Sequence, residues 1–189
     1  MNQKELFENA QRLFIEGKLS ESIIRFSEAM EAGEKTEIAY LSRGVAYLRS
    51  NEKEKAIDDF SSAVDMNNHN TRAHFYRGIA YMTNEKFREA IWDFDITIFL
   101  QPENGAAFFA RGTAYAQIGD DIEAARDIKK AIMYSESDTQ ELADTIGLFR
   151  TQLDKVMMIM DYGDNIPTLH LTNDEVSKVR RWLDDENYH

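Results

Sequence analysis

One five-residue phrase, Arg-Gly-x-Ala-Tyr, recurs three times in this chain at a fixed interval of 34 residues, at 43–47, 77–81 and 111–115. Downstream of each glycine, an alanine follows after twelve residues and a phenylalanine or isoleucine after sixteen. These residues are Ala56 and Phe60, Ala90 and Phe94, and Ala124 and Ile128. A fixed period of this length is typical of a repeat array, which constrains the fold more than any single motif does.

Each period reads as two helices joined by a turn. The second half of the copy at 37–70 carries an apolar stripe at helical spacing, formed by Ala56, Phe60, Ala63 and Val64. Turn residues separate the two halves at 17–18, 50–51, 84–85 and 119–120. A weaker first copy has Ala10, Leu13, Ser22 and Phe26 at the corresponding positions. Because no copy can bury its stripe alone, we expect four copies stacked around one continuous core.

This spacing resembles the tetratricopeptide repeat, whose pattern is Trp-x2-Leu-Gly-x2-Tyr, then Ala-x3-Phe, then Pro, over 34 residues. The resemblance extends over about 70% of the chain, from Gln3 to Glu136. The departures are local, since Tyr40, His74 and Phe108 replace the tryptophan, arginine replaces the leucine, and only Pro102 keeps the closing proline. The resemblance implies an all-α fold, a right-handed α-solenoid of four helix-turn-helix units.

We assign residues 1–136 to the repeat array, with copies at about 3–36, 37–70, 71–104 and 105–138. Beyond the array, apolar residues alternate at spacings of four and three, which predicts a further helix over 139–162. They are Leu142, Ile146, Phe149, Leu153, Val156 and Met160. We interpret this helix as a cap that covers the apolar face of the last copy. The alternative is self-association through the same stripe.

A hinge loop is expected at 163–171, and a short amphipathic helix at 172–189. Thr172 and Glu175 form the pattern of a capping box, and Leu171 with Val176 that of a hydrophobic staple. The apolar face of this helix consists of Val176, Val179, Trp182 and Leu183. A lone helix cannot bury such a face, so we expect it to dock on the array, on the helix at 139–162 or on a neighbour. A homodimer through the C-terminal helices is one form of such docking.

Composition limits the function classes. The net charge of −12 argues against nucleic acid and against an anionic membrane surface as the main partner. Because the chain has no cysteine, it can form neither a thiolate zinc site nor a redox-active pair. The first residues carry no basic leader or apolar segment, and no apolar run is long enough to span a membrane. We therefore expect an acidic, cytoplasmic protein.

Neither a catalytic nor a cofactor-binding pattern stands out. The four histidines include no pair at i, i+4 spacing, and His74 takes the place of a packing aromatic. The paired carboxylates at 58–59 and 120–121 are interpreted as helix caps or solvated charges. The chain has no Gly-rich phosphate loop, nucleophile elbow or His-Glu-x-x-His motif. We expect no enzyme activity, no metal and no cofactor; an enzyme or metal-binding protein is a remote alternative.

The family resemblance implies that the first helix of each copy lines a concave groove through repeat positions 2, 5, 9, 12 and 13. From these positions we take, as partner-binding residues, Phe7, Phe14, Leu41, Val45, Arg49, Arg72, Phe75, Ile79, Met82, Phe109 and Thr113. Gln11 and Ile15 hold the same positions in the first copy. The groove is mostly apolar, which suits a partner protein or peptide with apolar anchors, and Phe75 and Phe109 are expected to be its central anchors.

Some family members hold the C-terminal carboxylate of a peptide in a clamp of lysine, asparagine and arginine side chains. The corresponding residues here are Phe7, Gln11, Ser42, Arg72 and Tyr76. Only Arg72 is compatible with that role, so we do not expect a chaperone-tail clamp. The expected function is that of a protein–protein interaction adaptor or scaffold. The alternative is a secretion-type chaperone of the same family that cradles an apolar segment of its client.

The arginines of the repeated phrase predict ion pairs. Arg43, Arg77 and Arg111 each have an aspartate sixteen residues later, at Asp59, Asp93 and Asp127. The first copy has Asn9 and Arg25 instead, so both positions change together. We predict that each arginine reaches an aspartate across its helix pair or on the adjacent copy, with helix-end carbonyls accepting its remaining N–H groups.

Overall fold

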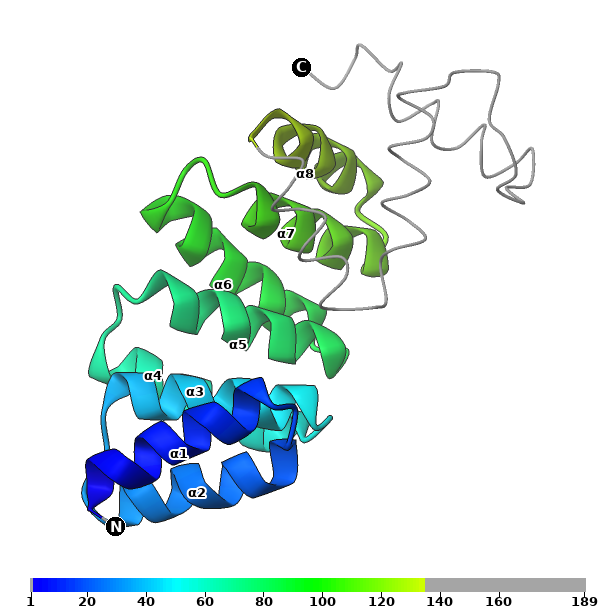
Figure 1. Cartoon of the computed structure of the whole chain (residues 1–189). Coiled ribbons are helices and arrows are strands. Elements are labelled where there is room, and N and C mark those ends of the chain that lie inside the picture. The colour runs from blue at the N-terminus through cyan, green and yellow to red at the C-terminus, as the bar shows by residue number, and fades with distance from the viewer. Residues whose placement is uncertain (1, 135–189) are drawn as a thin grey trace. The chain divides into compact units, whose positions relative to one another are not determined.

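A computed structural model describes residues 2–134 of the chain, which form eight α-helices and no strand (Figure 1). The helices are α1 (Gln3–Ile15), α2 (Leu19–Glu31), α3 (Glu37–Arg49), α4 (Lys53–Met66), α5 (Thr71–Thr83), α6 (Phe87–Leu100), α7 (Gly105–Gln117) and α8 (Asp121–Tyr134). Odd-numbered helices are the first, and even-numbered helices the second, of the four predicted copies. The predicted helix pairs are thus confirmed.

The chain divides into two compact units between Pro102 and Glu103, close to the predicted boundary between the third and fourth copies. The first unit holds α1 to α6, in which each helix packs against the next along the chain. The second unit holds the packed pair of α7 and α8. The helix predicted at 139–162, the hinge at 163–171 and the helix at 172–189 lie outside the described residues.

The predicted turns have a repeated backbone conformation. Gly17, Asn51, Glu85 and Gly119, spaced by one period, all have positive φ angles, between 59° and 81°. This left-handed conformation reverses the chain between the two helices of a copy, and glycine adopts it without strain. The turns expected at 17–18, 50–51, 84–85 and 119–120 are therefore present.

Side-chain caps begin the first helix of every copy. Asn2, Thr36, Asn70 and Asn104 each accept a hydrogen bond from the backbone N–H three residues later. At Asn2 the Glu5 side chain also accepts from the backbone N–H of the cap, which completes a capping box. These caps fix where the helices that carry the groove residues begin.

The small residues of the repeated phrase let a phenylalanine lie between the helices of a pair. A Cβ atom on Gly44 would lie 2.6 Å from Phe60, and one on Gly78 would lie 2.6 Å from Phe94. Phe60 and Phe94 are fully buried. The glycine is therefore required by the close approach of the ring and not by the backbone conformation.

The predicted ion pairs are present in all three copies. Each pair is bidentate, with the Nε and Nη2 groups of the arginine donating to the two carboxylate oxygens of the aspartate over 2.6–2.8 Å. The further acceptor was predicted incorrectly for two of them, since it is a serine hydroxyl and not a helix-end carbonyl. Arg43 donates from Nη1 to Ser27 over 3.0 Å, and Arg77 donates to Ser61 over 3.4 Å. Each serine belongs to the preceding copy, so these two arginines link neighbouring copies.

Candidate functional site

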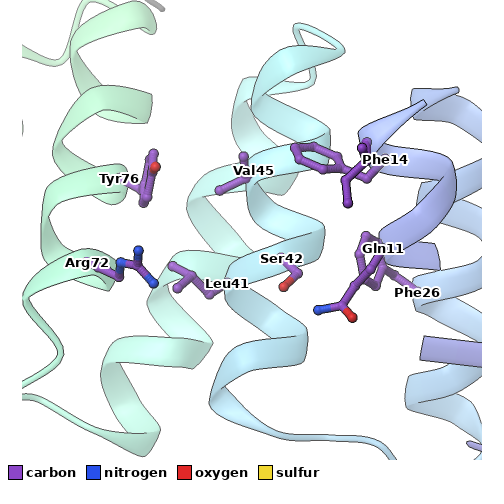
Figure 2. A pocket seen from close by; sticks show the side chains of 9 residues that line it. Gln11, Phe14, Phe26, Leu41, Ser42, Val45, Arg72 and Tyr76 are labelled. Atoms are coloured by element: carbon purple, nitrogen blue, oxygen red, sulfur yellow. The ribbon is translucent and has the colours of Figure 1, made fainter. Parts of the chain in front are cut away.

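An open cavity of about 410 Å³ lies against the first helices of the first three copies, α1, α3 and α5. Figure 2 shows it from close by. Its lining residues are Gln11, Phe14, Ile15, Phe26, Leu41, Ser42, Val45, Arg72 and Tyr76. Phe26 comes from α2; the other eight come from α1, α3 and α5.

Helical periodicity sets which side chains meet at this cavity. Leu41 and Val45 are one turn apart on α3, as are Arg72 and Tyr76 on α5, so each pair shares one face of its helix. In Figure 2 the side chains of Tyr76, Val45 and Phe14 lie at one level of the cavity. Those of Arg72, Ser42 and Gln11 lie at a second level, closer to the N-terminal ends of the helices. Leu41 also lies at the second level, between Arg72 and Ser42. The cavity thus has an apolar row, formed by Tyr76, Val45 and Phe14, and a polar row that Leu41 interrupts.

The apolar residues that line the cavity are partly exposed to solvent. Phe14, Leu41, Val45 and Tyr76 are half-buried, and Ile15 at the edge is 83% exposed. Phe26 is fully buried against Ala10 and Ala46. The buried Phe26 ring therefore packs behind the cavity, and the half-buried residues around the cavity expose apolar surface to a ligand.

The charge of the site is positive. Arg72 is the one charged residue among the nine that line the cavity, and Gln11 and Ser42 are its polar neighbours. A second cation lies nearby, since the guanidinium of Arg49 lies over the Phe14 ring at 4.9 Å from its centroid. The arrangement offers hydrogen-bond donors and apolar surface side by side, which is chemistry that suits the binding of a ligand.

Residues 2–134 show neither a metal-binding cluster nor a membrane-spanning helix. Within that range the structure brings together no group of three His, Cys, Asp or Glu side chains that could hold a metal ion. None of the helices in the same range combines the length and the apolar character needed to cross a membrane. His74 is buried, with Nδ1 2.9 Å from Oδ1 of Asp93 and Nε2 3.1 Å from the carbonyl oxygen of Asn68.

Comparison with protein families gives two matches, both described as tetratricopeptide repeat. One family model matches residues 38–70 and another matches residues 75–138, which together make up about half of the chain. The chain belongs to the tetratricopeptide repeat family. Its fold is accordingly an all-α tetratricopeptide solenoid. Among curated protein sequences, none matches the chain.

Solved tetratricopeptide structures share this fold. MamA is 24% identical with a TM-score of 0.68, over 74% of this chain and 81% of MamA. YrrB, described as a tetratricopeptide protein with an unusual peptide-binding site, is 20% identical with a TM-score of 0.68, over 77% of this chain and 75% of YrrB. The first tetratricopeptide domain of Spaghetti (RPAP3), bound to the HSP90 peptide SRMEEVD, is 26% identical with a TM-score of 0.58. That match covers 62% of this chain and 96% of the domain.

The structure brings part of the predicted tetratricopeptide groove together in the first unit. Phe14, Leu41, Val45 and Arg72 line the cavity, and Arg49 contacts Phe14. Phe7 instead packs on the core, with its ring 5.5 Å from that of Phe26. The binding role of these residues is still a prediction.

The remaining predicted groove residues do not line this cavity. Phe75 is half-buried and its ring contacts those of Phe94 and Tyr76, whereas Ile79 and Met82 are buried. Phe109 and Thr113 belong to the second unit and are also buried. Phe109 is therefore less accessible to a partner than the residues around the cavity of the first unit, whereas Phe75 is half-buried as they are.

Five lining residues were not on the list of predicted partner-binding residues: Gln11, Ile15, Phe26, Ser42 and Tyr76. Gln11 and Ile15 nevertheless hold groove positions that the family resemblance implies. Ser42 and Tyr76 occupy position 6 of their copies, a position used in the sequence only for comparison with the carboxylate clamp. That comparison was the signal that could have placed them in the site. Phe26 belongs to the second helix of its copy, and the pattern of first-helix positions gives no sign of it.

Proposed function

We propose that this protein is an adaptor or scaffold that binds a segment of another protein in the groove of its first unit. The observation that carries the proposal is the partly exposed apolar lining, in which Phe14, Leu41, Val45 and Tyr76 surround a cavity of about 410 Å³. Burying one large apolar side chain is worth about 1.5–3 kcal/mol. A partner side chain inserted into this cavity would gain free energy of that order.

The polar neighbours of the apolar row support binding of a polypeptide. Gln11, Ser42 and Arg72 offer hydrogen bonds next to the apolar surface, and a peptide needs such bonds for the backbone and polar groups that it brings to the site. The Spaghetti domain, 26% identical, is described as bound to a peptide, which supports the same use of this fold. An extended or helical segment with one or two apolar anchors is the ligand that this surface suits.

Display of random peptides tests the proposal without knowledge of the natural partner. Peptides selected on the immobilised full chain would be synthesised, and their affinity measured by fluorescence anisotropy. We expect selected peptides to share apolar residues and to bind the Ile15→Ser variant about tenfold more weakly than the wild type, because Ile15 lines the cavity.

The matched control is Ile24→Ser. Ile24 is also an exposed isoleucine, at 56%, but it lies on α2 and does not line the cavity. Both substitutions should leave the free energy of unfolding within about 0.5 kcal/mol of the wild type, because both side chains face solvent. Equal affinities of the two variants for every selected peptide, or failure to select any peptide, would contradict binding in this groove.

A further inference from the structure

Arg72 differs from the three arginines of the repeated phrase in having no carboxylate partner. Arg43, Arg77 and Arg111 are each paired with a buried aspartate. Arg72 is exposed, and no ion pair forms between it and any residue in the part of the chain that the structure describes. In a chain with a net charge of −12, a groove that holds one cation and no acid has the opposite sign to the protein as a whole.

The helix that carries Arg72 strengthens this positive charge. Arg72 lies in the first turn of α5, where free backbone N–H groups make the end of a helix positive. The first turns of α1 and α3 contain Glu5 and Glu37, whereas the first turn of α5 contains no acid. A cation at this end is unfavourable for the helix alone. An anion in the cavity would offset this unfavourable interaction, and both the Arg72 guanidinium and the N-terminal end of α5 would attract it.

The residues around Arg72 indicate which other groups a ligand needs besides the anion. Arg72, Ser42 and Gln11 lie at one level of the cavity, with Leu41 between Arg72 and Ser42. Tyr76, Val45 and Phe14 form the apolar row beside them (Figure 2). A guanidinium group presents parallel N–H donors that match the two oxygens of a carboxylate. The hydroxyl of Ser42 and the amide of Gln11 can donate hydrogen bonds to other polar atoms of the bound segment. The chemistry therefore fits a carboxylate adjacent to an apolar side chain.

We propose that the groove selects protein segments in which an aspartate or glutamate side chain stands beside the apolar anchor, with Arg72 binding the carboxylate. This inference rests on the proposed function and names the partner that it requires. The carboxylate belongs to an internal side chain and not to a chain terminus. Of the residues that hold a C-terminal carboxylate in other family members, only Arg72 has a counterpart here, since Phe7 and Tyr76 replace two of the polar groups.

The test uses a selected peptide, the same peptide with its acidic residue changed to glutamine or asparagine, and the same peptide with an amidated C-terminus. Each is measured by fluorescence anisotropy against the full-length wild type, Arg72→Gln and Arg88→Gln. Arg88 is the matched control, because it is an exposed arginine in the first turn of α6 that lies outside this cavity. Circular dichroism confirms that the variants are folded.

We expect selected peptides to be enriched in acidic residues, and Arg72→Gln to weaken their binding about tenfold. The same substitution should change the affinity for the neutralised peptide less than about twofold, because the coupling requires both charges. Arg88→Gln and C-terminal amidation should change neither affinity, and binding of the acidic peptide should weaken as ionic strength rises.

Equal effects of Arg72→Gln on the acidic and neutralised peptides would overturn the inference. So would selected peptides without acidic residues, or loss of binding on amidation. In each of these cases, dependence of the affinity on Ile15 would leave the proposed function standing. If no peptide binds the wild type, the proposed function fails and the inference fails with it.

Discussion

Arg77 donates two hydrogen bonds to Asp93, from Nε to Oδ2 and from Nη2 to Oδ1, and both are 2.8 Å long. Asp93 lies on α6 and has no exposed surface, so the ion pair joins α5 to α6 in the interior of the third copy. Nδ1 of His74 lies 2.9 Å from the same carboxylate. The equivalent pairs of Arg43 with Asp59 and Arg111 with Asp127 make this a repeated feature of the copies that carry the five-residue phrase.

Removing Arg77 should destabilise the fold strongly. Arg77→Met leaves the buried Asp93 carboxylate without its main partner, which we expect to lower the free energy of unfolding by about 3–5 kcal/mol. Urea denaturation followed by circular dichroism measures this. The control is Arg25→Met, because Arg25 pairs with Glu28 on the exposed surface, where a pair contributes less than about 1 kcal/mol. A loss no larger than that of the control would show that the buried pair contributes little.

Replacing both partners separates the cost of an unpaired charge from the contribution of the pair itself. The double variant Arg77→Met with Asp93→Leu has no buried carboxylate left at this place. We expect it to regain most of the stability lost in Arg77→Met, because buried ion pairs contribute little net stability compared with apolar residues of similar volume. A double variant as unstable as the single one would show that the pair, and not the isolated charge, determines the loss.

The helical glycines should not tolerate a methyl group. In an exposed helix, alanine in place of glycine is favourable by up to about 1 kcal/mol. At Gly78 the added Cβ would lie 2.6 Å from the buried Phe94 ring, so we expect Gly78→Ala to destabilise the protein by about 1–3 kcal/mol. At Gly112 the nearest atom would lie at 3.0 Å, so Gly112→Ala should destabilise less. The midpoints of urea unfolding of the two variants show which substitution destabilises the protein more.

A second substitution checks the cause of the Gly78 effect. Phe94→Leu shortens the side chain that the new methyl group would meet. We expect Phe94→Leu to cost less stability in the Gly78→Ala background than in the wild type, because it relieves the overlap there. If the effects of the two substitutions on stability are additive, the Phe94 ring is not what the added methyl group overlaps.

The Arg111–Asp127 pair should affect how the free energy of unfolding depends on pH. Burial raises the pKa of the Asp127 carboxyl above its usual value, although Arg111 acts in the opposite direction. The folded state then binds this proton more tightly than the unfolded state. The associated stability is fully present below the unfolded pKa of about 3.9 and is lost as pH rises through the folded pKa.

Asp127→Asn removes this titration. We therefore expect the stability of the wild type relative to Asp127→Asn to fall as pH rises from about 4 to about 7. Urea unfolding of both proteins at several pH values gives the difference. A difference that grows with pH would mean that the attraction of Arg111 outweighs burial, and that the pKa of Asp127 is lowered.

The sequence predicted the helix pairs because their determinants are local and repeated. In the second and third copies a glycine must face the phenylalanine sixteen residues later, and Gly78 with Phe94 shows that this spacing corresponds to a real contact. The paired change of Arg43 and Asp59 predicted an ion pair in the same way. The serine acceptor Ser27 was missed, because a contact between copies depends on how they stack and not on a spacing within one copy.

The candidate site was predicted only in part for a related reason. The family resemblance implies which repeat positions face the groove, and Leu41 and Val45, at two of these positions, line the cavity. It does not tell how deeply a face is covered, and Ile79 on the equivalent face of α5 is 3% exposed. The residues contributed by position 6 and by the second helices, such as Tyr76 and Phe26, become neighbours only once the copies are stacked.

The two tryptophans of the chain give a direct test of the helix predicted at 172–189, which lies outside the described residues. Trp92 is 58% exposed on α6, whereas Trp182 belongs to the predicted apolar face with Val176, Val179 and Leu183. A helix that docks through this face buries Trp182. We therefore predict that Trp182, observed alone in Trp92→Phe, emits at shorter wavelength and is quenched less by acrylamide than Trp92 observed alone in Trp182→Phe.

Removal of residues 164–189 tests the same docking through stability. If the helix packs on the rest of the chain, its loss uncovers apolar surface, so the melting temperature should fall and binding of a hydrophobic dye should rise. The control is Trp92→Ser in the full chain, which changes an exposed tryptophan and should leave both measurements close to those of the wild type. A truncated chain with an unchanged melting temperature, together with a Trp182 quenched as readily as Trp92, would show that this segment does not dock on the fold.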